Sequence, residues 1–162
     1  MPHEPRLTHD LRALLATQRV AALGTLDEDG LPFVSMVPYA LEPGSASLVI
    51  HVSALAAHTR NLQAMPHVSL LVMQAEVPGE PVHALPRVTL VGHATVPEAG
   101  SAAWADSRAA YLTRFPDSLP MTQLGDFMFV AIHILGARQV AGFGAARSLD
   151  ADEMERVLWP LA

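Results

Sequence analysis

The segment that most constrains the fold is a strand–helix–strand unit with a polar junction. The apolar strand Leu48–Val52 runs directly into Ser53, and a short helix follows. Pro66 ends that helix, and a second apolar strand, Val68–Met73, begins at once. A serine at the start of a helix is a favourable N-cap, because its hydroxyl accepts a hydrogen bond from a backbone N–H of the first turn. The pattern predicts that Ser53 caps the helix.

The same helix carries a run of polar residues that predicts an anion site. The first turn of a helix offers unpaired N–H groups and the positive end of the helix dipole. His58 and Arg60 add two side-chain donors beside it. A bound phosphate would fit this arrangement, and so would an ordinary capped helix with a solvated polar face. These residues alone leave both interpretations open.

The rest of the chain predicts a mainly β (α+β) protein with one domain over residues 1–162. Turn residues separate short apolar strands, and helical periodicity is confined to a few segments. This pattern favours six or seven antiparallel strands closed into a barrel, with helices packed outside. The strands are expected at Arg19–Leu26, Leu31–Tyr39, Leu48–Val52, Val68–Met73, Arg87–Val96, Asp126–Leu135 and Arg138–Phe143, and the helices at Leu7–Thr17, after Ser53, at Ser101–Arg114 and at Asp150–Leu158.

Composition excludes several kinds of chemistry. The chain has no cysteine, and all ten of its basic residues are arginine, so thiolate chemistry and lysine Schiff bases are ruled out. The net charge of −6 argues against binding to nucleic acid. No secretory signal or membrane-length apolar run is evident, so a cytoplasmic protein without membrane partners is expected. The hydrophobic content of 51% is high for this size and predicts apolar surface buried against a second subunit.

Four passages in the same order resemble the FMN-binding split-barrel family related to pyridoxamine 5′-phosphate oxidase. They are VAALGTLDEDGLPFVSMVPYA, SALAAHTRNLQAMPHVSLLV, PRVTLVGHATV, and YLTRFPDS with DFMFVAIHILGARQVAGFGAARSL. The last passage is similar to the haem-utilisation branch of the family. The resemblance extends from Leu14 to Leu149 and implies a split β-barrel. It also implies a homodimer with the cofactor at the subunit interface.

The resemblance also implies which residues bind the cofactor. The strand at residues 35–37 would lie along the flavin ring, residues 51–53 near the ring edge and the ribityl–phosphate arm, and residues 58–61 at the phosphate. Position 87 would contact the flavin, where the oxidase has a glutamine. The predicted FMN-binding residues are therefore Ser35, Met36, Val37, His51, Val52, Ser53, His58, Thr59, Arg60, Asn61 and Arg87.

Departures from the oxidase pattern argue for a different substrate. Ser35 and Ala40 stand where the oxidase has basic residues, and its C-terminal Arg-x-His substrate handle is absent. Tyr111, Arg114 and Ser118 resemble its other substrate contacts. We therefore expect an FMN-dependent oxidoreductase that acts on another small molecule, with its catalytic residues unassigned.

Two alternatives to an FMN oxidoreductase stay open. One is a haem-binding or haem-degrading protein, although the haem-ligating histidine of that branch lies in a C-terminal extension that this chain is expected to lack. The other is a flavin-binding module without turnover. The eight histidines show no helical metal-site spacing, so no metal site is expected, although His51, His93 and His133 lie on predicted strands that could meet in space.

Overall fold

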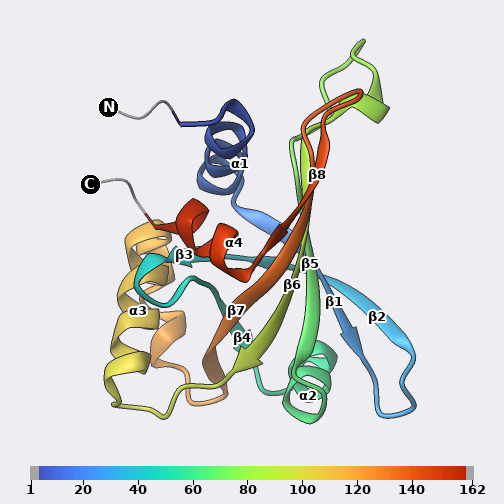
Figure 1. The fold of residues 1–162 in the computed structure, drawn as a ribbon. Coiled ribbons are helices and arrows are strands. Elements are labelled where there is room, and N and C mark those ends of the chain that lie inside the picture. Colours follow the sequence, from blue (N-terminus) through green and yellow to red (C-terminus); the bar gives the residue numbers. More distant parts are fainter. Residues whose placement is uncertain (1–3, 160–162) are drawn as a thin grey trace.

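The structure is a computed structural model that describes residues 4–159 of the chain. Helices and short strands alternate irregularly along the sequence, as Figure 1 shows. The elements are α1 (Arg6–Thr17), β1 (Val20–Leu26), β2 (Pro32–Pro38), β3 (Ala40–Glu42), β4 (Ser47–Ser53), α2 (Ala57–Ala64), β5 (His67–Met73), β6 (Arg87–Thr95), α3 (Ala102–Arg114), β7 (Phe127–Val140), β8 (Ala146–Asp150) and α4 (Ala151–Leu158).

The strands form one antiparallel sheet that curls on itself. Its order is β2-β1-β5-β6-β7-β4-β3, and β8 pairs with the C-terminal half of β7. The β1–β2 hairpin turns at Gly30, which has φ of 77° and donates its N–H to the Asp27 carbonyl at 2.9 Å. Only glycine adopts such a positive φ without strain. The predicted antiparallel split barrel with flanking helices is confirmed.

The structure corrects the predicted strand boundaries at the C-terminal end. The two strands expected on either side of Gly136 are one strand, β7, because Gly136 stays extended and pairs with Val91 on β6. A Cβ at this glycine would lie 3.3 Å from the carbonyl oxygen of Leu149 on β8, so the glycine permits close strand packing rather than a break. The short strands β3 and β8 were missed in the sequence.

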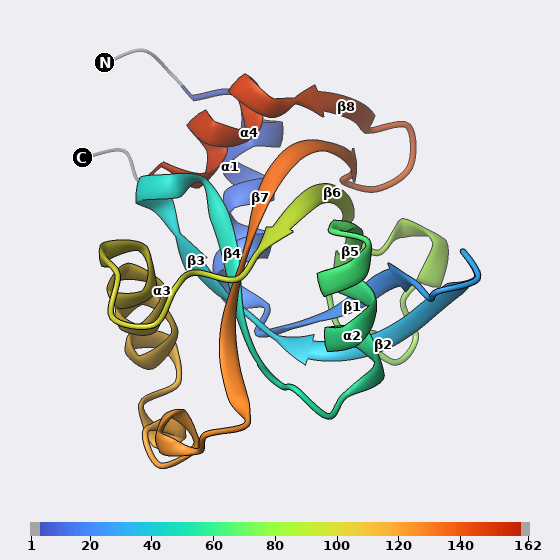
Figure 2. The same ribbon diagram turned by 90° about the horizontal axis from the view of Figure 1, so that it is seen from below.

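The helices cover different parts of the curled sheet. The α2 helix lies at one end of the sheet, against β1, β2 and β6, whereas α1 and α4 pack together toward the opposite end (Figure 1). The α3 helix covers β3, β4 and part of β7, and both views place it well away from α2 (Figure 2). No helix of residues 4–159 is long and apolar enough to cross a membrane.

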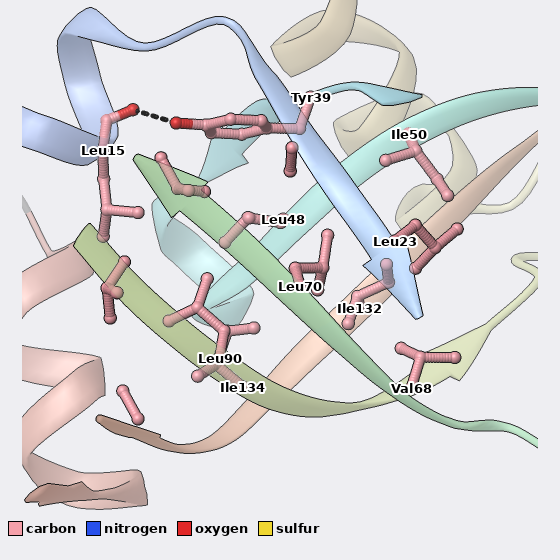
Figure 3. Close-up of a cluster of buried hydrophobic side chains, with 14 of the residues drawn as sticks. Leu15, Leu23, Tyr39, Leu48, Ile50, Val68, Leu70, Leu90, Ile132 and Ile134 are labelled. Atoms are coloured by element: carbon pink, nitrogen blue, oxygen red, sulfur yellow. Dashed lines mark hydrogen bonds between the residues drawn. The ribbon is translucent and has the colours of Figure 1, made fainter. Parts of the chain in front are cut away.

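The core fills the inside of the curl. Leucine and isoleucine side chains from five strands and from α1 meet there, each at most 1% exposed. Figure 3 shows them with the Tyr39 hydroxyl, which donates to the Leu15 carbonyl of α1 at 2.8 Å. Burying one such aliphatic side chain contributes about 1.5–3 kcal/mol. These contacts hold α1 against the inside of the sheet.

Candidate functional site

Among the described residues, one hydrogen bond joins predicted site residues from distant segments, and it links β2 to α2. The Ser35 hydroxyl lies 2.9 Å from Nδ1 of His58, which stands in the first turn of α2. Burial lowers the pKa of His58 below its usual range. The imidazole is therefore neutral near pH 7, and a neutral imidazole is the form that binds a metal. The hydrogen bond to Ser35 uses Nδ1, so Nε2 is the ring nitrogen left to bind a metal.

Ser53 does not cap α2, which corrects the sequence prediction. The helix begins four residues later at Ala57, and its N-cap, Ala56, makes no side-chain cap bond. The Ser53 hydroxyl instead accepts from the Leu55 N–H at 3.1 Å and donates to Asp126 at 3.3 Å. The residues between strand and helix form a turn, because the Ala56 N–H is bonded to the Ser53 carbonyl. Ser53 thus organises the turn that precedes the helix.

The other polar residues of α2 have separate tasks. Thr59 is fully buried and donates to the Ser53 carbonyl at 2.6 Å, which fixes the turn to the helix. Asn61 donates to the Thr25 hydroxyl on β1 at 3.0 Å. Arg60 is exposed, donates to the Leu55 carbonyl at 3.2 Å, and makes no ion pair among the described residues. Arg60 is thus a cation available at the surface of α2.

A hollow of about 460 Å³ lies between α2 and the β1–β2 hairpin. Its lining combines the Arg60 side chain with an aromatic ring and with two carboxylates from the hairpin turn. The lining residues are Asp27, Glu28, Phe33, Ala57, Arg60, Asn61 and Ala64. Phe33, which is 40% exposed, was not among the predicted site residues. Phe33 lies in the predicted strand close to the hairpin turn, and this position was the signal that could have added it to the predicted site residues.

The predicted residues on β2 and β4 do not all face α2. Alternation along β2 leaves Met36 exposed on the outer face of the sheet, while Val37 is buried in the core. Of the three, Ser35 is the one that forms a hydrogen bond with His58. Val52 on β4 is likewise part of the core, at 3% exposed. Any role of Met36, Val37 and Val52 toward a ligand stays a prediction.

His51 lies on the α3 side of β4 and is not brought together with His58. Its ring packs against Phe127, Phe129 and Tyr111, with ring centroids 4.6–5.6 Å apart. It is 8% exposed, and Nδ1 is buried without a hydrogen-bond partner among the described residues. Burial lowers the pKa of His51, so this imidazole is also neutral.

Arg87 lies at the other end of the sheet from α2. Its guanidinium donates to the His83 and Leu85 carbonyls at 3.2 and 2.9 Å. It lines a separate hollow of about 410 Å³ beside α1, together with Gln74 and Gln139. Within one chain, therefore, Arg87 and His58 do not share a cavity.

The three residues that resembled substrate contacts lie on and after α3. Tyr111 packs against His51, and Arg114 stacks over the Tyr39 ring with 5.2 Å between the guanidinium carbon and the ring centroid. Arg114 also donates to the Gln18 carbonyl. Ser118 lies in a short 3-10 helix after α3. The structure thus gives Arg114 a packing role between α3 and the strands.

A family model described as pyridoxamine 5′-phosphate oxidase matches residues 7–155. The chain belongs to this family. It is 27% identical over 150 residues to "Heme oxygenase HutZ" of Vibrio cholerae, covering 92% of this chain and 84% of that protein. It is 34% identical over 140 residues to "Non-canonical heme oxygenase HOZ, chloroplastic" of Arabidopsis thaliana, covering 85% of this chain and 41% of that protein.

Among solved structures, a heme binding protein from Mycobacterium smegmatis superposes with a TM-score of 0.84 at 30% identity. The match covers 95% of this chain, and the chain spans 62% of the mycobacterial protein. These relatives confirm the resemblance to the haem-utilisation branch. They contradict the predicted FMN-dependent oxidoreductase, because their names describe haem binding and haem oxygenation. The haem-binding alternative is the one they support, and FMN as a cofactor is not supported.

Proposed function

We propose that this protein binds haem and degrades it with oxygen and an external electron donor. The observation that carries the proposal is similarity to two haem oxygenases and a haem-binding protein over 85–95% of the chain. The aligned region includes β2, α2 and the hollow between them. The haem oxygenase activity in the names of those longer relatives is, for this chain, part of the proposal.

The residues at the β2–α2 junction fit the chemistry of haem. A haem needs an axial ligand, an apolar surface for the porphyrin and cations near its propionates. His58 offers a neutral imidazole whose other nitrogen is held by Ser35, the kind of support that orients metal-ligating histidines. Phe33 offers an exposed ring and Arg60 a cation on the neighbouring hollow, whose lining includes Asp27 and Glu28 but not His58. We assign His58 as the residue that would ligate the haem iron.

The bound iron would supply oxygen binding and redox chemistry, and the chain would supply position and environment. Ser35 would fix the direction of the His58 ring, and with Nδ1–H donating to the Ser35 hydroxyl, Nε2 would be the nitrogen that binds the iron. Arg60 would pair with a carboxylate at the edge of the site, and Phe33 would exclude water from one face of a flat ligand.

We also propose that the protein is a homodimer joined through the outer face of its sheet. Six apolar side chains on β1, β2, β5, β6 and β7 are 42–68% exposed on that face, namely Val20, Val34, Met36, Met73, Val91 and Leu135. A soluble monomer rarely leaves this many apolar side chains on one face open to water. A stable interface with a second copy would need to bury about 1,000 Å² or more. Ser35 and Met36 are neighbours on β2 but point to opposite faces, so the haem site and the proposed interface would lie on opposite sides of this strand.

Haem titration of the purified chain tests the binding proposal. The wild type should give a saturable Soret band, and His58→Ala should weaken haem binding at least about tenfold and shift the band, as expected when a ligand is removed. His83→Ala is the matched control, because His83 lies in the exposed loop between β5 and β6. No saturable Soret band in the wild type would overturn haem binding. Equal affinities and spectra for the wild type and His58→Ala would overturn the ligand assignment.

Degradation and dimerisation have their own measurements. With a reductant and oxygen, the Soret band of the loaded wild type should decay while a cleaved tetrapyrrole accumulates; a stable band would limit the function to binding. Light scattering should show a dimer, and Met36→Glu should shift it toward monomer by placing a charge in the apolar interface. A wild-type monomer at micromolar concentration would contradict the interface.

A further inference from the structure

Three histidines form a row across neighbouring strands on the outer face of the sheet. His67 on β5 pairs directly with His93 on β6, and His93 pairs directly with His133 on β7. The adjacent residues Val68 and Ala94 are buried in the core, so alternation directs the histidines outward. His67 and His133 are exposed, and His93 is half-buried. The row is separate from His58, which lies on α2.

The His67 and His93 rings have the spacing of two ligands on one ion. Their centroids lie 5.2 Å apart with the planes at 86°. Two imidazoles bound to one tetrahedral ion, with each nitrogen about 2.0–2.1 Å from the metal, hold their ring centroids about 5 Å apart. The pair therefore needs a rotation of the rings and no movement of the strands. His67 is exposed in the single chain, and the pair lies beyond Val91 along β6, at the edge of the apolar patch proposed for dimerisation, which leaves room for that rotation.

His133 is held away from this pair. Its Nδ1 lies 3.0 Å from the Ser45 carbonyl, which can only accept, so Nδ1 carries the proton and the ring is tied toward the turn before β4. Strands are about 4.8 Å apart, so the first and third members of such a row are about 10 Å apart, too far for one ion. Within residues 4–159, no group of three His, Cys, Asp or Glu side chains is placed to hold a metal ion together.

We propose that His67 and His93 bind a divalent transition-metal ion through two imidazole nitrogens, with water completing the coordination. Imidazole ligands suit Cu²⁺, Zn²⁺ and Ni²⁺, whereas Mg²⁺ and Ca²⁺ prefer oxygen ligands. Among the three, Cu²⁺ should bind most tightly, as the general order of affinities for divalent ions requires. Because both ligands must be unprotonated, binding should weaken in acid.

The ion would link β5 to β6 only in the folded state. These strands are joined by the long segment between Met73 and Arg87, so they are not held together by a tight turn. A ligand that binds only the folded protein raises its stability in proportion to the logarithm of ligand concentration over Kd. At an ion concentration of about 100 times Kd, the Tm of the chain should rise by several degrees.

The test is calorimetric titration and thermal unfolding of the full chain, untagged, haem-free and treated with chelator. CuCl2 and ZnCl2 are the probes, and MgCl2 is the negative control. The wild type and His133→Gln should bind one ion with the same affinity and show the same rise in Tm. His67→Gln and His93→Gln should each bind at least about tenfold more weakly. His133→Gln is a matched control because it removes an outward histidine of the same row that the proposal leaves out of the site.

The outcomes separate this site from the haem site. Equal affinity in the wild type and His67→Gln, or loss of binding in His133→Gln alone, would overturn the assignment. Should His93→Gln fail to fold by circular dichroism, His67→Gln decides the question, because His67 is exposed and its replacement leaves the core unchanged. His67→Gln and His93→Gln should both retain the wild-type haem spectrum. Failure of the metal site would therefore leave the haem proposal standing, and failure of haem binding would leave the metal proposal standing.

Discussion

Replacing Tyr39 with phenylalanine should destabilise the fold by removing one buried hydrogen bond. Tyr39 is fully buried, and its hydroxyl donates to the Leu15 carbonyl at 2.8 Å (Figure 3). Leu15 lies in the last turn of α1, where carbonyls have no helical partner. Among the described residues no backbone N–H donates to that carbonyl. Burial raises the pKa of Tyr39, so the hydroxyl keeps its proton and acts as donor at any ordinary pH.

The magnitude follows from what Tyr39→Phe leaves behind. The ring is preserved, so packing is unchanged, and the cost is that of an unsatisfied buried carbonyl, about 1–3 kcal/mol. For a chain of this size each kcal/mol lowers Tm by about 2–4 °C. Denaturant unfolding should therefore show a lower midpoint at an unchanged m-value. Thermal unfolding should show a Tm about 2–12 °C lower.

Tyr111→Phe is the matched control for the same change of one oxygen atom. Tyr111 is 5% exposed, and its hydroxyl has no hydrogen bond among the described residues. The control should stay within about 0.5 kcal/mol of the wild type. Equal losses in the two variants, or a Tyr39→Phe protein as stable as the wild type, would refute the assignment of the loss to the Leu15 carbonyl.

Two further changes test the sheet and the buried imidazoles. A Cβ at Gly92 would lie 2.7 Å from a backbone carbonyl oxygen of β7, so Gly92→Ala should lower the free energy of unfolding by about 1–3 kcal/mol. Gly125→Ala should leave the free energy of unfolding unchanged, because a Cβ there would have no atom within 4 Å. Burial lowers the pKa of His51 and His58, so the unfolded chain binds more protons in mild acid. The free energy of unfolding should therefore fall as the pH drops below about 6.5. The fall should be smaller in His51→Phe, which removes one of the two buried imidazoles. Denaturant unfolding at about pH 8 and about pH 5.5 measures both changes.

Local sequence patterns were enough to predict most of the fold, because each strand carries its own alternation and each turn its own chemistry. The β1–β2 hairpin shows this clearly, with Asp27 and Gly30 forming the turn that the sequence predicts. The prediction failed where a residue's role depends on a distant neighbour. Gly136 predicts a break when only its own segment is considered, yet it allows β7 to lie close to Leu149 on β8. No local pattern contains that second strand.

The site shows the same division between local and long-range information. The polar run on α2 was visible in the sequence, but the Ser35–His58 contact joins residues 23 positions apart and exists only because the sheet curls until β2 reaches α2. The row of His67, His93 and His133 was hidden for a related reason. Its members are separated by a long loop and by α3, so no turn type sets their register in the sequence. Register across a sheet is a property of packing, and packing decides which histidines share a face.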